Sequence, residues 1–284
     1  MLSKSYASAW PPTWSARILF IVKKLVLVLF SLVIIVPLVI MVSTAFKPDG
    51  EIYDFPVRLI AQNPTLDNFR QLKDTFPLYI WNSVKLTLIM TVVQLFTATT
   101  AAYAFSKLKW KGRDILFLTY VASMMIPAQS VIIPQFLIVR SFGLYDTHLS
   151  LILTGAFSAF GTFLVKQYFI TIPQSYSEAA YLDGASDLTI FSRIILPLST
   201  PVLATQMIFS FRYFWNDFFT PLIFITSPNL KTLPLGMSDF VAETYVYLGP
   251  QMAATCISII PVMIVFIAAQ KYFVEGVAAS GVKG

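Results

Sequence analysis

The 284-residue sequence has few of the side chains on which soluble enzymes depend. It contains one cysteine, Cys256, and one histidine, His148. One cysteine cannot form an internal disulfide, and the two residues together cannot supply a cysteine–histidine metal site or a histidine-based catalytic pair. Charged residues make up only 12% of the chain. The composition therefore argues against a disulfide-stabilised domain and leaves soluble-enzyme chemistry little to work with.

A nucleotide-binding loop is also missing. A P-loop needs the pattern Gly-x4-Gly-Lys-Ser/Thr, because its backbone surrounds the phosphates and its lysine neutralises them. Gly276 and Gly281 have the required spacing, but Val282, Lys283 and Gly284 follow them. We therefore expect this chain to bind no cofactor, and any ATP and magnesium to be bound by another chain.

Apolar residues are what the sequence has in abundance. They make up 57% of the chain, and the mean hydropathy is +0.73, which is typical of an integral membrane protein. A chain of 284 residues has room for about six helices of about 20 residues each. The net charge of +6 lies largely beside the apolar runs, where basic residues set topology, so it does not indicate nucleic-acid binding.

The apolar runs predict an all-α bundle of six membrane-spanning helices, at residues 25–46, 84–105, 115–139, 149–169, 199–225 and 251–270. The short turn after the second run contains Lys107, Lys109, Lys111 and Arg113, so it is predicted to be cytoplasmic. Counting from this turn places both termini and residues 170–198 on the cytoplasmic side. The predicted organisation is a cytoplasmic segment (1–24), a membrane domain (25–270) and a cytoplasmic tail (271–284).

The third run is interrupted by Pro127 and Pro134. Two prolines imply kinks and free carbonyl groups, which a bilayer tolerates only next to protein or a water-filled cavity. Gln129 and Gln135 lie beside these kinks. A buried amide needs hydrogen-bond partners, and a sugar can supply them, although packing explains either glutamine better when it is taken alone.

A polar interval, residues 175–197, interrupts the apolar second half of the chain. The spacing of Ser175 and Glu178 predicts a capped helix that starts near Tyr176. Gly184 predicts a break, after which Asp187 can cap a second short helix that Pro197 limits. The interval is therefore predicted to form an elbow of two short helices, with alanines small enough for another protein to approach, at Ala179, Ala180 and Ala185.

This interval resembles the EAA loop of the membrane subunits of ABC importers. The resemblance rests on the spaced triplets Glu178-Ala179-Ala180, Asp183-Gly184-Ala185 and Ile195-Leu196-Pro197. In that family the loop is a cytoplasmic coupling helix that docks in a groove of the ATPase. The resemblance implies that Glu178, Ala179, Ala180, Asp183 and Gly184 contact the ATPase, whereas the alternative is a simple linker helix.

The fifth run carries polar groups at a depth where they usually face a protein interior. Helical spacing predicts one shared face for Arg212, Trp215, Asn216 and Phe219, with Asp217 beside Tyr213. Such a face suits a sugar path, and the alternative is that Arg212 bonds carbonyls of the third run. Trp215-Asn216-Asp217-Phe218 with Pro221-Leu222-Ile223 also resembles the fifth span of carbohydrate-importer permeases.

Residues 226–250 are predicted to form an outer loop, and residues 271–284 a C-terminal tail. Each segment resembles the corresponding segment of the smaller permease of the maltose importer. A loop of this length and apolar content is expected to fold against something. The resemblance implies contacts with a solute-binding protein and with the ATPase, while the alternatives are a lid packed on its own bundle and a frayed end. The implied contact residues are Gly236, Met237, Ser238, Asp239 and Phe240 in the loop and Gly281, Val282, Lys283 and Gly284 in the tail.

The sequence from about Pro64 onward is therefore similar to carbohydrate-type ABC importer permeases. The resemblance implies a sugar or oligosaccharide substrate, a prokaryotic cell membrane, a homologous second permease, two ATPase subunits and an extracytoplasmic binding protein. An ion-coupled secondary transporter remains the alternative, with Asp217 as its best candidate carboxylate. A membrane enzyme would need clustered nucleophiles, bases or ligands, which the sequence does not supply.

Overall fold

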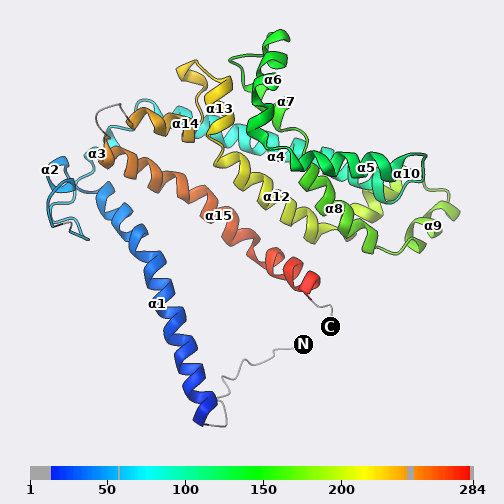
Figure 1. The fold of residues 1–284 in the computed structure, drawn as a ribbon, viewed down its shortest axis with the longest axis horizontal. Coiled ribbons are helices and arrows are strands. Elements are labelled where there is room, and N and C mark those ends of the chain that lie inside the picture. The colour runs from blue at the N-terminus through cyan, green and yellow to red at the C-terminus, as the bar shows by residue number, and fades with distance from the viewer. Residues whose placement is uncertain (1–13, 57, 242–245, 282–284) are drawn as a thin grey trace. The chain divides into compact units, whose positions relative to one another are not determined.

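The computed structural model describes residues 14–56, 58–241 and 246–281 (Figure 1). The elements in these ranges are helices, and the β-pairing seen there is an isolated bridge between Val241 and Val246. The chain forms two compact units, one made of residues 1–71 and 247–256 and the other of residues 72–246 and 257–284. The predicted all-α fold is confirmed.

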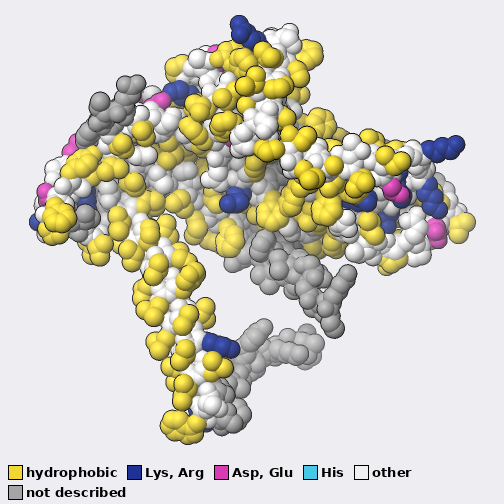
Figure 2. Space-filling view, viewed as in Figure 1, with side chains coloured by type: hydrophobic (Ala, Val, Ile, Leu, Met, Phe, Trp, Pro, Cys, Tyr) yellow, Lys and Arg dark blue, Asp and Glu magenta, His cyan; other side chains and the backbone are white. Residues whose placement is uncertain are grey.

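The first unit contains α1 (Trp14–Ala45), α2 (Asp49–Ile52), α3 (Asp67–Arg70) and the start of α15 (Leu248–Gly281). Apolar side chains cover α1 along its length, as Figure 2 shows in yellow, which suits a helix surrounded by lipid. The end of α1 is held by Asn68, whose buried amide donates to the carbonyls of Ala45 and Lys47 at 3.0 and 2.8 Å. These bonds satisfy carbonyl groups that have no partner within the helix.

Three helices form the centre of the second unit. They are α4 (Phe76–Ser106), α8 (Ala159–Thr171) and α12 (Thr200–Trp215), and they run side by side (Figure 1). Each end of this group has its own buried apolar cluster. One cluster, here called the elbow cluster, includes Tyr103, Val165, Phe169, Ile190 and Ile195. The other, the loop cluster, includes Leu86, Met90, Leu151, Phe214, Phe224 and Leu235.

Three of the predicted spans are broken helices. The third run forms α5 (Arg113–Ala122) and α6 (Ala128–Ser141), which meet at 104°, and the fourth forms α7 (His148–Gly155) and α8, which meet at 41°. The fifth forms α12 and α13 (Phe219–Phe224). Pro127 explains the sharpest bend, because it has no N–H to donate and favours an extended conformation at Ile126.

The number of membrane crossings depends on these breaks. Within the described ranges, three helices are long and apolar enough to span a membrane, at Arg17–Ala45, Phe76–Ser106 and Leu248–Ala268. Three further crossings arise only if each bent pair is one span: α5 with α6, α7 with α8, and Asp187–Leu198 with Thr200–Trp215. The six-helix count therefore stays a prediction, whereas several membrane-length apolar helices are present.

Residues 226–241 of the predicted loop pack on α4. It contains a 3-10 turn (η3, Pro228–Leu230), a short helix (α14, Leu233–Met237) and a second 3-10 turn (η4, Ser238–Phe240). The Asn82 amide of α4 donates to the carbonyls of Asn229 and Lys231 at 2.9 and 3.0 Å, and Phe240 stacks on Phe76 at 5.2 Å. This stretch thus folds as a lid on its own unit.

Asp146 joins this lid to the turn between α6 and α7. Its carboxylate accepts hydrogen bonds from the backbone N–H of Thr226 at 2.8 Å and from the N–H and hydroxyl of Ser227 at 2.9 and 2.5 Å. The Ser227 hydroxyl, followed by the two N–H groups, lowers the pKa of Asp146. The residue adopts a left-handed conformation with φ 57°, which asparagine also tolerates.

The substitution Asp146→Asn is therefore expected to remove the charge without straining the backbone. It should lower the melting temperature of the purified protein at pH 7 by about 2–4 °C, the size expected for loss of about 1 kcal/mol in a protein of this length. Because the folded-state pKa is depressed, the wild-type advantage is complete above about pH 4 and is lost as the pH falls through the folded-state pKa.

Melting curves across pH test this prediction, with the exposed Asp74→Asn as the matched control. Equal melting temperatures for the two variants at pH 7 would show that the Asp146 carboxylate does not hold the lid.

Candidate functional site

A cavity of about 810 Å³ lies in the second unit, where the ends of several helices converge. Its wall is formed by parts of α4, α6, α7, α12 and α13. Five of the six residues predicted from sequence for a translocation path line it: Gln129, Gln135, Arg212, Asn216 and Asp217. Phe219, which the sequence placed on the same face as Arg212, also lines it, and so do Thr154 and Thr220, which were not singled out from the sequence.

The cavity forms where broken helices leave backbone groups without partners. The break after α7 frees the carbonyls of Gly155 and Ala156, and α4 satisfies both. Gln94 donates its amide to Gly155 at 3.0 Å, and Thr97 donates its hydroxyl to Ala156 at 2.5 Å. Irregular backbone is stable in an apolar bundle only with such partners.

Gly155 is required for this close approach. A Cβ atom at this position would lie 2.5 Å from the Cε of Met90 and 2.8 Å from a ring carbon of Phe214. A side chain here would force both the end of Met90 and the Phe214 ring to move. The glycine keeps the broken helix close enough for Gln94 to reach its carbonyl.

A second cavity, of about 400 Å³, shares Thr154, Gly155, Arg212 and Tyr213 with the first. Its wall carries a buried hydrogen-bond chain in which Gln206 donates to the Ser210 hydroxyl at 3.0 Å and Ser210 donates to Gln94 at 2.6 Å. Gln206 is 1% exposed, and its Oε1 has no hydrogen-bond partner among the described residues. Glutamines inside apolar runs are the signal that could have identified this second cavity from sequence.

Arg212 lines both cavities. The alternative in which its guanidinium bonds the carbonyls of the third run is wrong for this structure, because no such bond forms within the described residues. Asp217 accepts instead from the N–H of Thr220 at 3.0 Å, which caps the start of α13, and makes no ion pair there with Arg212. The Asn216 amide donates to the backbone carbonyl of Arg212 at 2.8 Å.

Trp215 lines neither cavity, unlike the other five residues predicted for the path. It is 1% exposed, and its indole N–H donates to the carbonyl of Ser258 at 3.0 Å. The predicted shared face with Asn216 and Phe219 assumed a continuous helix, whereas α12 ends at Trp215 and α13 begins at Phe219. The break turns the residues after it in new directions.

The polar interval forms the predicted elbow, but its caps differ from the prediction. Ser175 is the first residue of α9 (Ser175–Leu182) rather than its cap, and Ser186, not Asp187, caps α10 (Asp187–Ile190) by accepting from the N–H of Thr189. Pro197 does not end the second piece. The chain continues through a π-helical turn (Phe191–Ile195) and α11 (Leu196–Leu198), and it bends by 81° near Ser199.

Gly184 forms the break between α9 and α10, as predicted. Its φ is +80°, and the Ala185 N–H bonds the carbonyl of Ala180 at 2.9 Å, which closes the end of α9. No atom lies within 4 Å of a Cβ placed on Gly184. The position therefore requires glycine for its left-handed backbone and not for space.

One face of the elbow is buried against its own bundle. Ala180 is buried in the elbow cluster, although the sequence placed it on the contact face, and Ala185 is partly buried against the same cluster. Tyr103 of α4 donates its hydroxyl to the Asp187 carbonyl at 3.3 Å. Tyr181 donates to the Asp187 carboxylate, and this bond raises the pKa of Tyr181.

The other face of the elbow is exposed. It carries Glu178, Ala179, Asp183 and Gly184 of the predicted set. It also carries two leucines that sequence reasoning missed, Leu182 at 91% exposure and Leu188 at 73%. Their position as large apolar side chains within a polar interval is the sequence feature that could have identified them. Such a patch, rimmed by polar residues, is typical of a protein contact.

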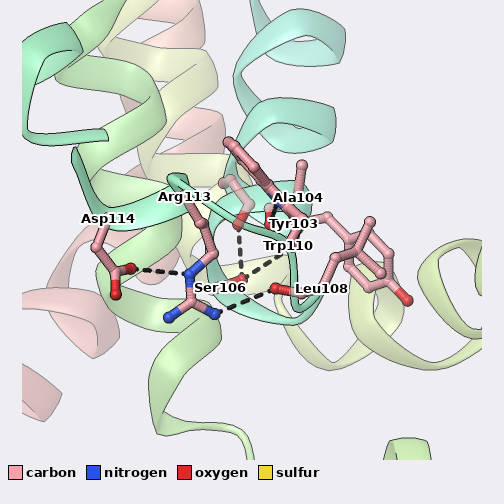
Figure 3. A network of polar contacts seen from close by, with 8 residues as sticks. Tyr103, Ala104, Ser106, Leu108, Trp110, Arg113 and Asp114 are labelled. Carbon is pink, nitrogen blue, oxygen red and sulfur yellow. Dashed lines mark hydrogen bonds and ion pairs between the residues drawn. The ribbon is translucent and has the colours of Figure 1, made fainter. Parts of the chain in front are cut away.

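The basic turn between α4 and α5 lies beside the elbow cluster (Figure 3). The Lys107 ammonium is buried and donates to the Ile172 carbonyl at the end of α8 at 2.6 Å, and burial lowers the pKa of Lys107. Arg113 donates to the Leu108 carbonyl at 3.1 Å and pairs with Asp114 at 2.8 Å. The Arg113 bonds order the turn itself, and the Lys107 bond holds it against the chain segment that leads into α9.

Comparison with known proteins identifies the class of this membrane bundle. Residues 94–278 match the family described as binding-protein-dependent transport system inner membrane component. The chain belongs to this family. The resemblance seen in the sequence is thereby confirmed, and the family is one of membrane components of transport systems and not of enzymes.

Individual relatives match along most of their length. The chain is 34% identical over 260 residues to a probable ABC transporter permease, YurM, of Bacillus subtilis (strain 168). The aligned region covers 91% of this chain and 87% of that protein. It is 32% identical over 265 residues to the maltodextrin transport system permease MdxG of the same organism, covering 92% and 95%.

A solved structure is also similar. It is a bacterial ABC transporter involved in the import of the acidic polysaccharide alginate, with a TM-score of 0.82 and 28% sequence identity, and the match covers 92% of this chain and 98% of that chain.

The predicted loop contact set is described in full, whereas the tail contact set is described only at Gly281. Gly236 of the loop set is buried against the Tyr79 ring, and Asp239 is exposed and pairs with Lys231 at 2.6 Å. Gly281 is the last residue of α15. Val282, Lys283 and Gly284, together with residues 242–245, lie outside the described residues.

Proposed function

We propose that this permease subunit moves a sugar or oligosaccharide across the cytoplasmic membrane of a prokaryote. The observation that carries the proposal is the cavity lined by amides, a guanidinium and a carboxylate in an otherwise apolar bundle. Their donors and acceptors are accessible and pair well with sugar hydroxyls. Relatives named for maltodextrin, arabinooligosaccharide and galactooligosaccharide transport support the same substrate class.

The proposed complex contains a homologous second permease, two ATPase subunits and an extracytoplasmic binding protein. ATP and magnesium would bind to the ATPases, because this sequence contains no P-loop. We propose that both termini and the elbow are cytoplasmic. The support is the basic turn at residues 107–113, which follows the positive-inside pattern and lies beside the elbow.

The elbow is the proposed site of coupling to the ATPase. Its exposed face offers Glu178, Asp183 and the two leucines to a partner groove, while its buried face belongs to the elbow cluster. Because that cluster includes residues of α4, α8 and α12, a push on the elbow moves these helices as a body. Since α4 and α12 also line the large cavity, the same movement changes its shape.

Transport by the assembled complex in lipid vesicles tests this function. We expect uptake of a labelled oligosaccharide to require ATP together with the binding protein, and to be unaffected by collapse of proton and sodium gradients. An ion-coupled secondary transporter, which the family disfavours, would show the reverse dependence. Gradient-driven uptake without ATP would therefore refute the proposal.

Gly184→Val is expected to disrupt coupling through the backbone alone. An L-residue in the left-handed region costs about 1–2 kcal/mol, and a β-branched residue is disfavoured there most strongly. The variant should lose most binding-protein-stimulated ATP hydrolysis, or fail to retain the ATPase on purification, while its membrane bundle still folds.

Gly184→Asn is the matched control, because asparagine tolerates a positive φ and the site has room for its side chain. Copurification of the ATPase and stimulated hydrolysis are measured for both. If the valine variant couples as well as the asparagine variant, the elbow break has no role in docking.

The loop is the proposed contact with the binding protein. Its exposed surface includes Asp239 and Val241, whereas Gly236 faces inward, so we restrict the contact to the end of η4 and the residues that follow. Val241→Arg should reduce binding-protein-stimulated ATP hydrolysis severalfold and leave basal hydrolysis unchanged, because a large charge replaces an exposed apolar contact.

Val241→Thr keeps the shape of the side chain and should behave like the wild type. Stimulated and basal ATP hydrolysis are compared for the three proteins. Full stimulation of the arginine variant would mean that the loop serves only as a lid on α4.

A further inference from the structure

We propose that Arg212 binds an anionic group of the transported saccharide, a uronate carboxylate or a phosphate. This proposal rests on the proposed function and names its substrate class more closely. It places the charged part of the substrate where the two cavities share a wall, because Arg212 lines both.

The first argument is the missing counter-charge. Arg212 lies in the last turn of α12, and within the described residues its guanidinium makes no hydrogen bond and no ion pair. An arginine cannot lose its charge, and the Arg212 side chain is exposed where the two cavities meet, so a ligand in either cavity can reach the guanidinium. The buried Lys107 differs, because its ammonium already bonds a carbonyl of its own chain.

The second argument is the distribution of acidic groups. The lining of the 400 Å³ cavity includes Arg212 and no aspartate or glutamate. The lining of the larger cavity includes one, Asp217, which caps α13 instead of pairing with Arg212. The field near the guanidinium is therefore positive on the side of the smaller cavity. A planar guanidinium with several donors matches a carboxylate or phosphate better than it matches a single hydroxyl.

The third argument is the arrangement of neutral polar groups around this charge. Gln129, Gln135 and Asn216 line the larger cavity and offer amide donors and acceptors to hydroxyl groups. On the other side, the Oε1 of Gln206 is an acceptor without a partner among the described residues. A saccharide with one anionic group uses both kinds of partner. A fully neutral saccharide leaves the charge of Arg212 uncompensated.

Binding to the assembled complex in lipid nanodiscs tests the proposal. The binding protein is omitted so that its own selectivity does not enter. Isothermal calorimetry compares trigalacturonate with its methyl ester, which has the same sugar skeleton without charge, and glucose 6-phosphate with glucose. The proteins are the wild type, Arg212→Gln, Arg212→Lys and the matched control Lys166→Gln, which removes a cation that lines neither cavity.

We expect the wild type and Lys166→Gln to bind one of the anionic probes at least about tenfold more tightly than its neutral partner, since ion-assisted hydrogen bonds are about twice as strong as neutral ones. Arg212→Gln should lose this preference while its affinity for the neutral partner stays the same. Arg212→Lys should keep part of it. A preference for the uronate alone identifies a carboxylate, and a preference for the sugar phosphate alone identifies a phosphate.

Equal affinities for charged and neutral probes in the wild type overturn the proposal, as does a preference that survives in Arg212→Gln. Disassembly of the Arg212→Gln complex, combined with no preference in the wild type, would show that Arg212 pairs with an acidic group of another subunit. These outcomes leave the proposed function intact if ATP-dependent uptake of a neutral oligosaccharide persists. Absence of ATP-dependent uptake of every saccharide would refute the proposed function itself.

Discussion

The structure depends on how broken backbone is satisfied inside an apolar bundle. Where α7 ends, Gln94 and Thr97 of α4 supply the donors that the carbonyls of Gly155 and Ala156 lack. Because water is scarce in such a bundle, these bonds make the break possible, and the break in turn leaves space for a cavity. A continuous helix would satisfy its own carbonyls but would offer no polar wall.

The long helix α4 connects every functional part of the second unit. Its first turns hold the lid through Asn82, its middle satisfies the α7 break through Gln94, and its last turns anchor the elbow through Tyr103. In the proposed coupling, a movement at the elbow would reach the cavity through one rigid element and two packed clusters. Such a body has discrete arrangements rather than continuous ones, which suits a transporter that alternates between two states.

Particular residues show how far the sequence could be read. The position of Gly184 predicted the elbow break, because no other residue so readily adopts its backbone conformation. Gln129, Gln135, Arg212, Asn216 and Asp217 were selected as polar residues in apolar runs, and they do line one cavity. Trp215 was assigned to the same face by helical spacing, but its side chain is buried and its indole N–H bonds the carbonyl of Ser258 instead. Leu182 and Leu188 were missed because polar residues surround them.

The sequence by itself determined an all-α membrane protein, its family and the elbow, because hydropathy, the spaced EAA pattern and glycine conformation are local properties. Only the tertiary structure decided where the helices break, which side of the elbow is buried and which polar residues share a cavity. Those features depend on partners distant in the chain, such as Gln94 with Gly155 and Tyr103 with Asp187. Spacing along one helix cannot report a bond that crosses between helices.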